Sequence, residues 1–236
     1  MSDAQPTRMI EAFADKAALS QACADVLADA LSRRLAQGSG KARMMLTGGS
    51  TPVGCYEVLK DRPLDWSRVE LALTDDRFVP PNDPNSNEKL AREHLLKGPA
   101  AAAHLTPLWS DVDSPEKAAA KAEPAIRALG RMDAVLLGVG PDGHICSLFP
   151  HSPQRAEGMD PDARRLVIGV PKAEQPPHVP RITLTWPAFM NTDLVVILIS
   201  GDDKKQVIQA ALAGADMPVR AVLTQTQVPV RILWAA

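Results

Sequence analysis

The chain passes from a short apolar run directly into a glycine turn in the stretch ARMMLTGGSTPVGCYEVL, residues 42–59. Residues 42–46 are mostly apolar, as in a buried strand, and residues 53–59 carry apolar side chains at helical spacing. The two glycines between them allow unusual backbone dihedral angles. The stretch therefore predicts a strand, a tight turn and a helix, the repeating pattern of a parallel α/β sheet.

The same alternation continues in both directions along the chain. Apolar residues at three- and four-residue spacing predict a helix over 16–36. Further strands are expected at 69–73, 134–139, 166–170, 182–185, 194–199 and 230–233, and further helices at 87–96, 115–129 and 202–213. Continuous apolar strands alternating with helices are typical of a mostly parallel sheet covered on both faces. We therefore expect a Rossmann-like α/β fold in a single domain, residues 1–236.

Composition and charge exclude several classes of function. The net charge is −2 and the Lys and Arg residues are dispersed, so no nucleic-acid partner is expected. The longest apolar run, 194–199, is too short to cross a bilayer, and residues 1–9 lack a signal-peptide pattern. Three widely spaced cysteines without a CxxC pair indicate reduced thiols. We expect a cytoplasmic protein without a membrane partner, either a monomer or a small homo-oligomer.

Residues 47–52 form a candidate anion site. Exposed amides and the dipole at the start of the predicted helix favour a negative charge there, and Ser50 or Thr51 can cap the helix. An ordinary strand–helix turn has the same pattern, and no Lys-Ser or Lys-Thr follows the glycines as it does in a P-loop. We nevertheless favour phosphate binding, because the glycines let a ligand approach the backbone closely.

Asp75, Asp76 and Arg77 follow the predicted strand 69–73. Acidic side chains at a strand end can handle protons or orient a sugar hydroxyl, and an arginine can bind phosphate with two hydrogen bonds. The same residues read equally well as a surface ion pair, which stabilises a protein little. Their position at the carboxyl end of a strand favours a role in ligand binding.

The sequence GVGPDGH, residues 138–144, follows another predicted strand and contains G-x-G-x-x-G. A dinucleotide site would need these glycines to open a long helix, but Pro141 and Pro150 interrupt one. We favour a loop that projects His144 into the crevice, because imidazole suits general base catalysis near neutral pH. The other histidines lack metal-ligand spacing, so no metal is expected, and Cys146 is interpreted as a small packing residue.

Three cations are less clear from the pattern alone. Lys204 lies in the first turn of the predicted helix 202–213, where a cation opposes the helix dipole. That local cost favours a ligand at Lys204, although a solvated lysine is an equally good interpretation. Lys172 and Arg181 flank a proline-rich loop, residues 171–180, and either close over an anionic substrate or face water.

Five motifs in this order resemble the 6-phosphogluconolactonase family, which shares a fold group with the glucosamine-6-phosphate deaminases. They are LTGGSTP (46–52), DDRFVP (75–80), GVGPDGH (138–144) with SLFP (147–150), RITLT (181–185) and GDDK (201–204). Deaminases typically have Asn-Glu-Pro after the histidine and a tyrosine at position 77. This chain has Leu148-Phe149-Pro150 and Arg77, and both departures favour the lactonase.

The resemblance implies a carboxylic ester hydrolase of the pentose phosphate pathway, which converts 6-phospho-D-glucono-1,5-lactone into 6-phospho-D-gluconate without a cofactor. It implies that His144 activates water and that Asp75 orients water or a sugar hydroxyl. The expected substrate and phosphate ligands are Thr47, Gly48, Gly49, Ser50, Arg77, Lys172, Arg181 and Lys204. The alternatives are a deaminase-isomerase, a non-catalytic sugar-phosphate-binding module and, third, an NAD-dependent oxidoreductase.

Overall fold

The structure, a computed structural model, describes residues 9–236 and contains a seven-stranded parallel sheet. The expectation about a signal peptide falls almost entirely on residues 1–8, which lie outside the described residues. The strand order is β1-β10-β9-β6-β2-β3-β5, and every neighbouring pair is parallel. The strands are β1 (Ile10–Ala12), β2 (Ala42–Leu46), β3 (Val69–Leu73), β5 (His104–Thr106), β6 (Ala134–Leu137), β9 (Val195–Ser200) and β10 (Val230–Ala235).

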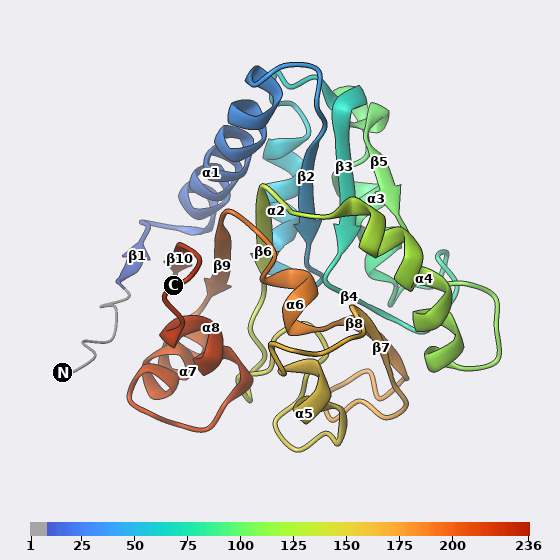
Figure 1. Cartoon of the computed structure of the whole chain (residues 1–236). Helices are drawn as coiled ribbons and strands as arrows, with labels where there is room; N and C mark the ends of the chain where they lie inside the picture. Colours follow the sequence, from blue (N-terminus) through green and yellow to red (C-terminus); the bar gives the residue numbers. More distant parts are fainter. Residues whose placement is uncertain (1–8) are drawn as a thin grey trace.

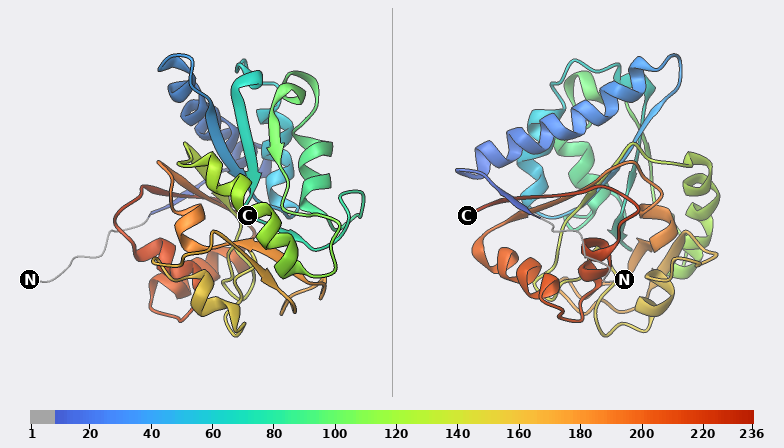
Figure 2. Two further views of the ribbon diagram at one scale, coloured as in Figure 1. Left: turned by 45° about the vertical axis from the view of Figure 1, so that its right-hand side comes forward. Right: turned by 60° about the vertical axis from the view of Figure 1, so that its left-hand side comes forward.

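Helices cover both faces of this sheet, which confirms the predicted α/β fold. Figures 1 and 2 show α1, α2 and α3 on one face and α4 on the other. The helices are α1 (Lys16–Ala36), α2 (Thr51–Leu59), α3 (Asn87–His94), α4 (Pro115–Leu129), α5 (Gln154–Gly158), α6 (Trp186–Phe189), α7 (Asp202–Leu212) and α8 (Pro218–Thr224). None of the helices within residues 9–236 has the length and apolar character needed to cross a membrane.

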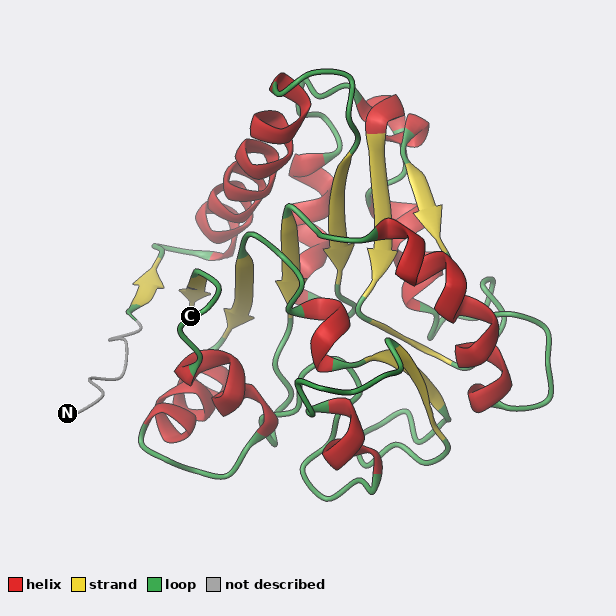
Figure 3. Ribbon diagram, in the orientation of Figure 1, coloured by secondary structure: helices red, strands yellow, loops and turns green. Residues whose placement is uncertain are grey.

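A second, antiparallel sheet was not predicted. Its strands, in the order β4-β8-β7, are β4 (Asp75–Arg77), β8 (Arg181–Leu184) and β7 (Val167–Val170). Thr74 links the two sheets, because its N–H donates to the carbonyl of Leu46 on β2 and its carbonyl accepts from the N–H of Leu184 on β8. Figure 3 shows this small sheet beyond the carboxyl ends of the parallel strands. Residues 75–77 are therefore a strand themselves, not a loop after one.

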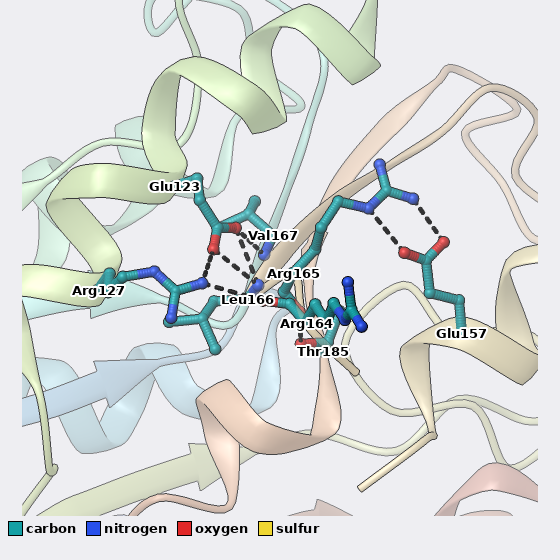
Figure 4. A network of polar contacts seen from close by, with 8 residues as sticks. All are labelled: Glu123, Arg127, Glu157, Arg164, Arg165, Leu166, Val167 and Thr185. Atoms are coloured by element: carbon teal, nitrogen blue, oxygen red, sulfur yellow. Dashed lines mark hydrogen bonds and ion pairs between the residues drawn. The ribbon is translucent and has the colours of Figure 1, made fainter. Parts of the chain in front are cut away.

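The small sheet is fixed to α4 by Glu123. The Glu123 carboxylate accepts hydrogen bonds from the N–H groups of Leu166 and Val167, both at 2.8 Å, and also pairs with Arg127 one turn further along the helix (Figure 4). These N–H groups lie at the start of β7, an edge strand with no further strand to pair them. The helix side chain therefore supplies acceptors that the sheet lacks.

The sheet reverses its direction of growth between β2 and β6. The chain proceeds from β2 to β3 and β5 on one side, and from β6 to β9 and β10 on the other. Strands β2, β3, β6 and β9 are almost entirely buried, so their positions are held by the core. In open α/β sheets, ligands bind beyond the carboxyl ends of the strands at such a switch point. The structure therefore indicates where a site is expected before any side chain is considered.

Candidate active site

A cavity of about 430 Å³ lies at this switch point. Its walls include residues 47–50, called here the TGGS turn, which follows β2, and part of residues 140–144, called here the GPDGH loop, which follows β6. Eight of the ten residues predicted for the site line the cavity: Thr47, Gly48, Gly49, Ser50, Asp75, Arg77, His144 and Lys204. The structure thus brings most of the predicted residues together, although their individual roles stay predictions.

The TGGS turn is held from behind by the only tyrosine of the chain. The hydroxyl of Tyr56 accepts from the N–H of Thr47 at 3.0 Å and donates to the carbonyl of Thr47 at 2.6 Å. Complete burial raises the pKa of Tyr56 well above its usual value, so the hydroxyl keeps its proton. Ser50 occupies the N-cap position of α2, but its side chain makes no capping hydrogen bond. The capping expectation is not met, and no side chain competes with a ligand for the first amides of α2.

Asn87, which sequence reasoning missed as a site residue, connects this turn with Arg77. Its Oδ1 accepts from Nη1 of Arg77 at 2.9 Å, and its Nδ2 donates to the carbonyl of Asp75 at 2.9 Å. A Cβ atom on Gly48 would lie only 1.9 Å from Oδ1 of Asn87, so a glycine is required for this approach. The only signal in the sequence was its position at the start of a predicted helix.

Asp76 lies behind the cavity, not in its wall. Its carboxylate accepts from the N–H groups of Arg77, Asn87 and Glu88 and from the hydroxyl of Ser86. Burial raises the pKa of Asp76 to about 6, although the three backbone hydrogen bonds act in the opposite direction. Asp76 therefore fixes the start of α3, and with it the position of Asn87.

His144 is oriented by Asp142, the second residue missed as a site residue. Nδ1 of His144 lies 2.6 Å from Oδ1 of Asp142. Burial alone would raise the pKa of Asp142, but hydrogen bonds from His144 and Gln175 and the charge of the imidazole lower it to about 2. Because an ionised carboxylate only accepts hydrogen bonds, Nδ1 must carry the proton. The lone pair of the neutral ring is then on Nε2, which suits a general base.

Close packing around His144 explains the glycines of the GPDGH loop. A Cβ atom on Gly140 would lie 2.0 Å from Nδ1 of His144 and 2.7 Å from Oδ1 of Asp142. Gly143 has φ +79°, a conformation that favours glycine, and it turns the chain between Asp142 and His144. The imidazole also packs on Phe149, with ring centroids 4.7 Å apart. The ring is thus held on two sides.

Asp75 and Lys204 complete the polar wall. The buried Asp75 accepts from the hydroxyl of Ser147 at 2.5 Å through Oδ2, while its Oδ1 has only a long contact of 3.4 Å with the hydroxyl of Thr74. Burial lowers the pKa of Lys204, whereas the charges of Asp142 and Asp203 act in the opposite direction. Lys204 has no hydrogen-bond partner among residues 9–236, so its ammonium group is available to an anionic ligand.

Lys172 and Arg181 do not line the cavity. Lys172 is exposed in the proline loop, residues 171–180. Arg181 is only 3 % exposed, and its Nη2 donates to the carbonyls of Gln175 and Pro177 at 3.3 and 2.6 Å. The expectation that both contact substrate is therefore unsupported by this arrangement. The difference arises because Arg181 lies on a strand of the small sheet, which the sequence did not reveal.

Cys146 lines the cavity but shows no sign of a nucleophile. Burial raises the pKa of its thiol well above the usual value, so the reactive thiolate is disfavoured. Its φ of +53° is unusual for a residue other than glycine, and marks the tight turn that leads to Ser147. Within residues 9–236, no group of three or more His, Cys, Asp or Glu side chains is arranged to hold a metal ion.

Residues 14–234 match the family described as glucosamine-6-phosphate isomerases/6-phosphogluconolactonase. A protein of Caulobacter vibrioides named 6-phosphogluconolactonase is 42% identical over 226 residues, which are 96% of this chain and 97% of the relative. The crystal structure of a 6-phosphogluconolactonase from Shewanella baltica superimposes with a TM-score of 0.92 at 33% identity, covering 98% of this chain and 99% of the other. A monomeric glucosamine-6-phosphate deaminase, with a TM-score of 0.75 at 21% identity over 96% of both chains, shares the fold alone. The chain belongs to the 6-phosphogluconolactonase family, within the larger group that also contains the glucosamine-6-phosphate isomerases.

Proposed function

We propose that this protein hydrolyses 6-phospho-D-glucono-1,5-lactone to 6-phospho-D-gluconate. The observation that carries the proposal is the hydrogen bond between His144 and Asp142, at a cavity that also contains an uncapped helix start and two cations. The names of the similar proteins from Caulobacter vibrioides and Shewanella baltica support the same substrate. We further propose that residues 1–236 act as one unit in the cytoplasm, in keeping with three free cysteines.

In the proposed reaction, Nε2 of His144 takes a proton from a water molecule as the water oxygen bonds to the lactone carbonyl carbon. The resulting imidazolium is stabilised by the Asp142 carboxylate. It then returns the proton to the ring oxygen as the bond between that oxygen and the carbonyl carbon breaks. General base catalysis of this kind contributes roughly 10²–10⁴-fold. A lactone is an activated ester, so an effect of this size is adequate for a useful rate.

The phosphate is assigned to the TGGS turn and the two cations. Amides and the dipole at the start of α2 attract an anion, and Arg77 and Lys204 each add a charge-assisted hydrogen bond. Asp75 retains an oxygen with only a long contact, which is suited to orienting a water molecule or a sugar hydroxyl. Binding at the distant phosphate positions the carbonyl beside His144, which is how remote contacts assist catalysis.

The test is an assay of the purified wild-type protein with the phosphorylated lactone, measuring acid release above the spontaneous rate. Glucosamine 6-phosphate is assayed in parallel for ammonia release. We expect lactone hydrolysis and no ammonia. Ammonia release would indicate a deaminase, and a ligand-induced rise in melting temperature without any turnover would indicate a non-catalytic sugar-phosphate-binding module.

A further inference from the structure

We infer that Gln175 is a positioning residue, which fixes the carboxylate of Asp142 and thereby the orientation of His144. The inference rests on the proposed function, because it assigns a residue that supports the proposed base. Gln175 belongs to the proline loop, far from the GPDGH loop in the sequence, and nothing in its local pattern distinguished it from a solvated amide.

The geometry places hydrogen-bond donors on both oxygens of Asp142. Oδ1 accepts from His144, and Oδ2 accepts from Nε2 of Gln175 at 3.0 Å. A carboxylate held by a single oxygen can rotate about its terminal bond, which is a broad and soft torsion. With a donor on each oxygen, the plane of the carboxylate is fixed. The imidazole that it orients then keeps its reactive nitrogen at one position in the cavity.

Arg181 in turn fixes the segment of the proline loop that carries Gln175. Its Nη2 donates to the carbonyls of Gln175 and Pro177, and His178 contacts the carbonyl of Ala173 through Nδ1 at 3.1 Å. Arg181 is anchored on β8, where it is paired with Arg77 of β4. The buried arginine therefore acts on the site through the loop backbone, in place of the direct contact with substrate that the sequence suggested.

The charged groups that face Asp142 set the expected response to pH. His144 faces it from the same loop and Lys204 from α7. Gln175 adds a donor without a charge, so it steadies the carboxylate without weakening the attraction between Asp142 and the imidazolium. Replacing this amide by a carboxylate adds a negative charge at the same place. The protonated imidazole is then favoured, and activity is lost at a higher pH as the solution is acidified.

The experiment compares Gln175→Ala and Gln175→Glu with wild type and with Gln206→Ala, an exposed control on α7. We expect Gln175→Ala to lower kcat roughly tenfold, the size of one hydrogen bond to a charged group, with KM within about twofold. We expect Gln175→Glu to move the acidic limb of the pH profile of kcat/KM upward by about one pH unit. An increase of KM at constant kcat would identify Gln175 as a substrate ligand, and unchanged kinetics in both variants would also overturn the inference.

A second readout does not depend on turnover. In ¹⁵N-histidine-labelled protein, the Nδ1–H resonance of His144 is expected to be protected from exchange in wild type and to broaden or vanish in Gln175→Ala. Equal protection in both proteins contradicts the inference. If the wild type fails to hydrolyse lactone, the proposed function falls, and this spectrum still decides whether Gln175 positions the Asp142–His144 pair.

Discussion

The TGGS turn and the GPDGH loop hold corresponding places, each at the carboxyl end of a central strand, yet they present different chemistry to the same cavity. The TGGS turn leads into α2 and offers backbone amides at a helix start. No helix follows the GPDGH loop directly, and it offers a side chain, His144. The first turn is suited to binding an anion, and the second loop is suited to moving a proton.

The two regions are supported in the same way. Behind each lies an aspartate that receives several hydrogen bonds, Asp76 through Asn87 for the TGGS turn and Asp142 for the GPDGH loop. In each, one glycine permits a close side-chain approach, Gly48 to Asn87 and Gly140 to His144. The difference in function therefore arises from the residues that come after the glycines, and a substitution in one region should leave the function of the other intact.

The largest effect is expected for Gly140→Ala. The added Cβ would lie 2.0 Å from Nδ1 of His144 and would separate the imidazole from Asp142. We expect kcat to fall by about 10²–10⁴-fold, the range for losing a general base, with a smaller change of KM. Gly138→Ala is the matched control, since its Cβ would make an ordinary contact of 3.4 Å with Thr47. Equal kinetics for the two variants would contradict the difference between the regions.

The next effect separates the two aspartates by their response to pH. The folded-state pKa of Asp76 is raised from 3.8 to about 6 by burial, so the folded protein retains a proton that the unfolded chain releases. Its contribution to stability is present below about pH 4 and is lost as the pH rises to about 6, by roughly 3 kcal/mol. For Asp142, whose pKa is depressed, stability is lost instead as the pH falls from about 4 to 2.

Urea denaturation of wild type and Asp76→Asn between pH 4 and 7 measures this contribution. We expect the unfolding free energy of the wild type to fall more steeply with rising pH than that of the variant. Parallel curves would show that Asp76 does not titrate in this window.

A smaller effect is expected for Gly48→Ala, where the new Cβ displaces Asn87 from Arg77. Loss of one or two hydrogen bonds, each contributing about 1 kcal/mol, raises KM about tenfold and leaves kcat nearly unchanged. In the background of Asn87→Ala the clash is relieved, so the second substitution should cost much less. Additive effects in this double-mutant cycle would show that the two residues act independently.

The smallest effects concern the cations. Lys204→Ala should raise KM for the phosphorylated lactone about tenfold through loss of a charge-assisted hydrogen bond. Lys205→Ala is the control, because the neighbouring ammonium packs over the ring of Trp234, 3.7 Å from its centroid, and does not line the cavity. Lys172→Ala should change KM by less than about twofold, because Lys172 lies outside the cavity. A larger change for Lys172 would restore its predicted role in binding.

Much of the fold was predictable because local pattern determines it. The bounds of α1, β2, β3 and α4 match the expected ranges, since each has an apolar repeat that ends at a clear stop signal. The expected cap of α3 is also present, with the hydroxyl of Ser86 accepting from the N–H of Lys89. By contrast, β4 has the sequence Asp-Asp-Arg, with no apolar alternation. It is a strand only because β8 supplies its hydrogen-bond partners, and no local signal reports a distant partner.

The same distinction applies to the site. Residues at the ends of β2, β3, β6 and β9 were predictable, because the edge of a parallel sheet brings successive strand ends together. Gln175 and Asn87 were not, since an amide side chain that faces a cavity has the same local pattern as one that faces water. Asp142 stood inside a recognised motif, but its contact with His144 depends on the turn at Gly143, which spacing alone does not reveal.

The most direct test is the kcat of His144→Ala with the phosphorylated lactone, measured beside wild type at saturating substrate. The account predicts a fall of about 10²–10⁴-fold with KM nearly unchanged, because the phosphate contacts at the TGGS turn, Arg77 and Lys204 remain. A variant that keeps the wild-type kcat would show that His144 is not the base, and the proposed mechanism would be wrong.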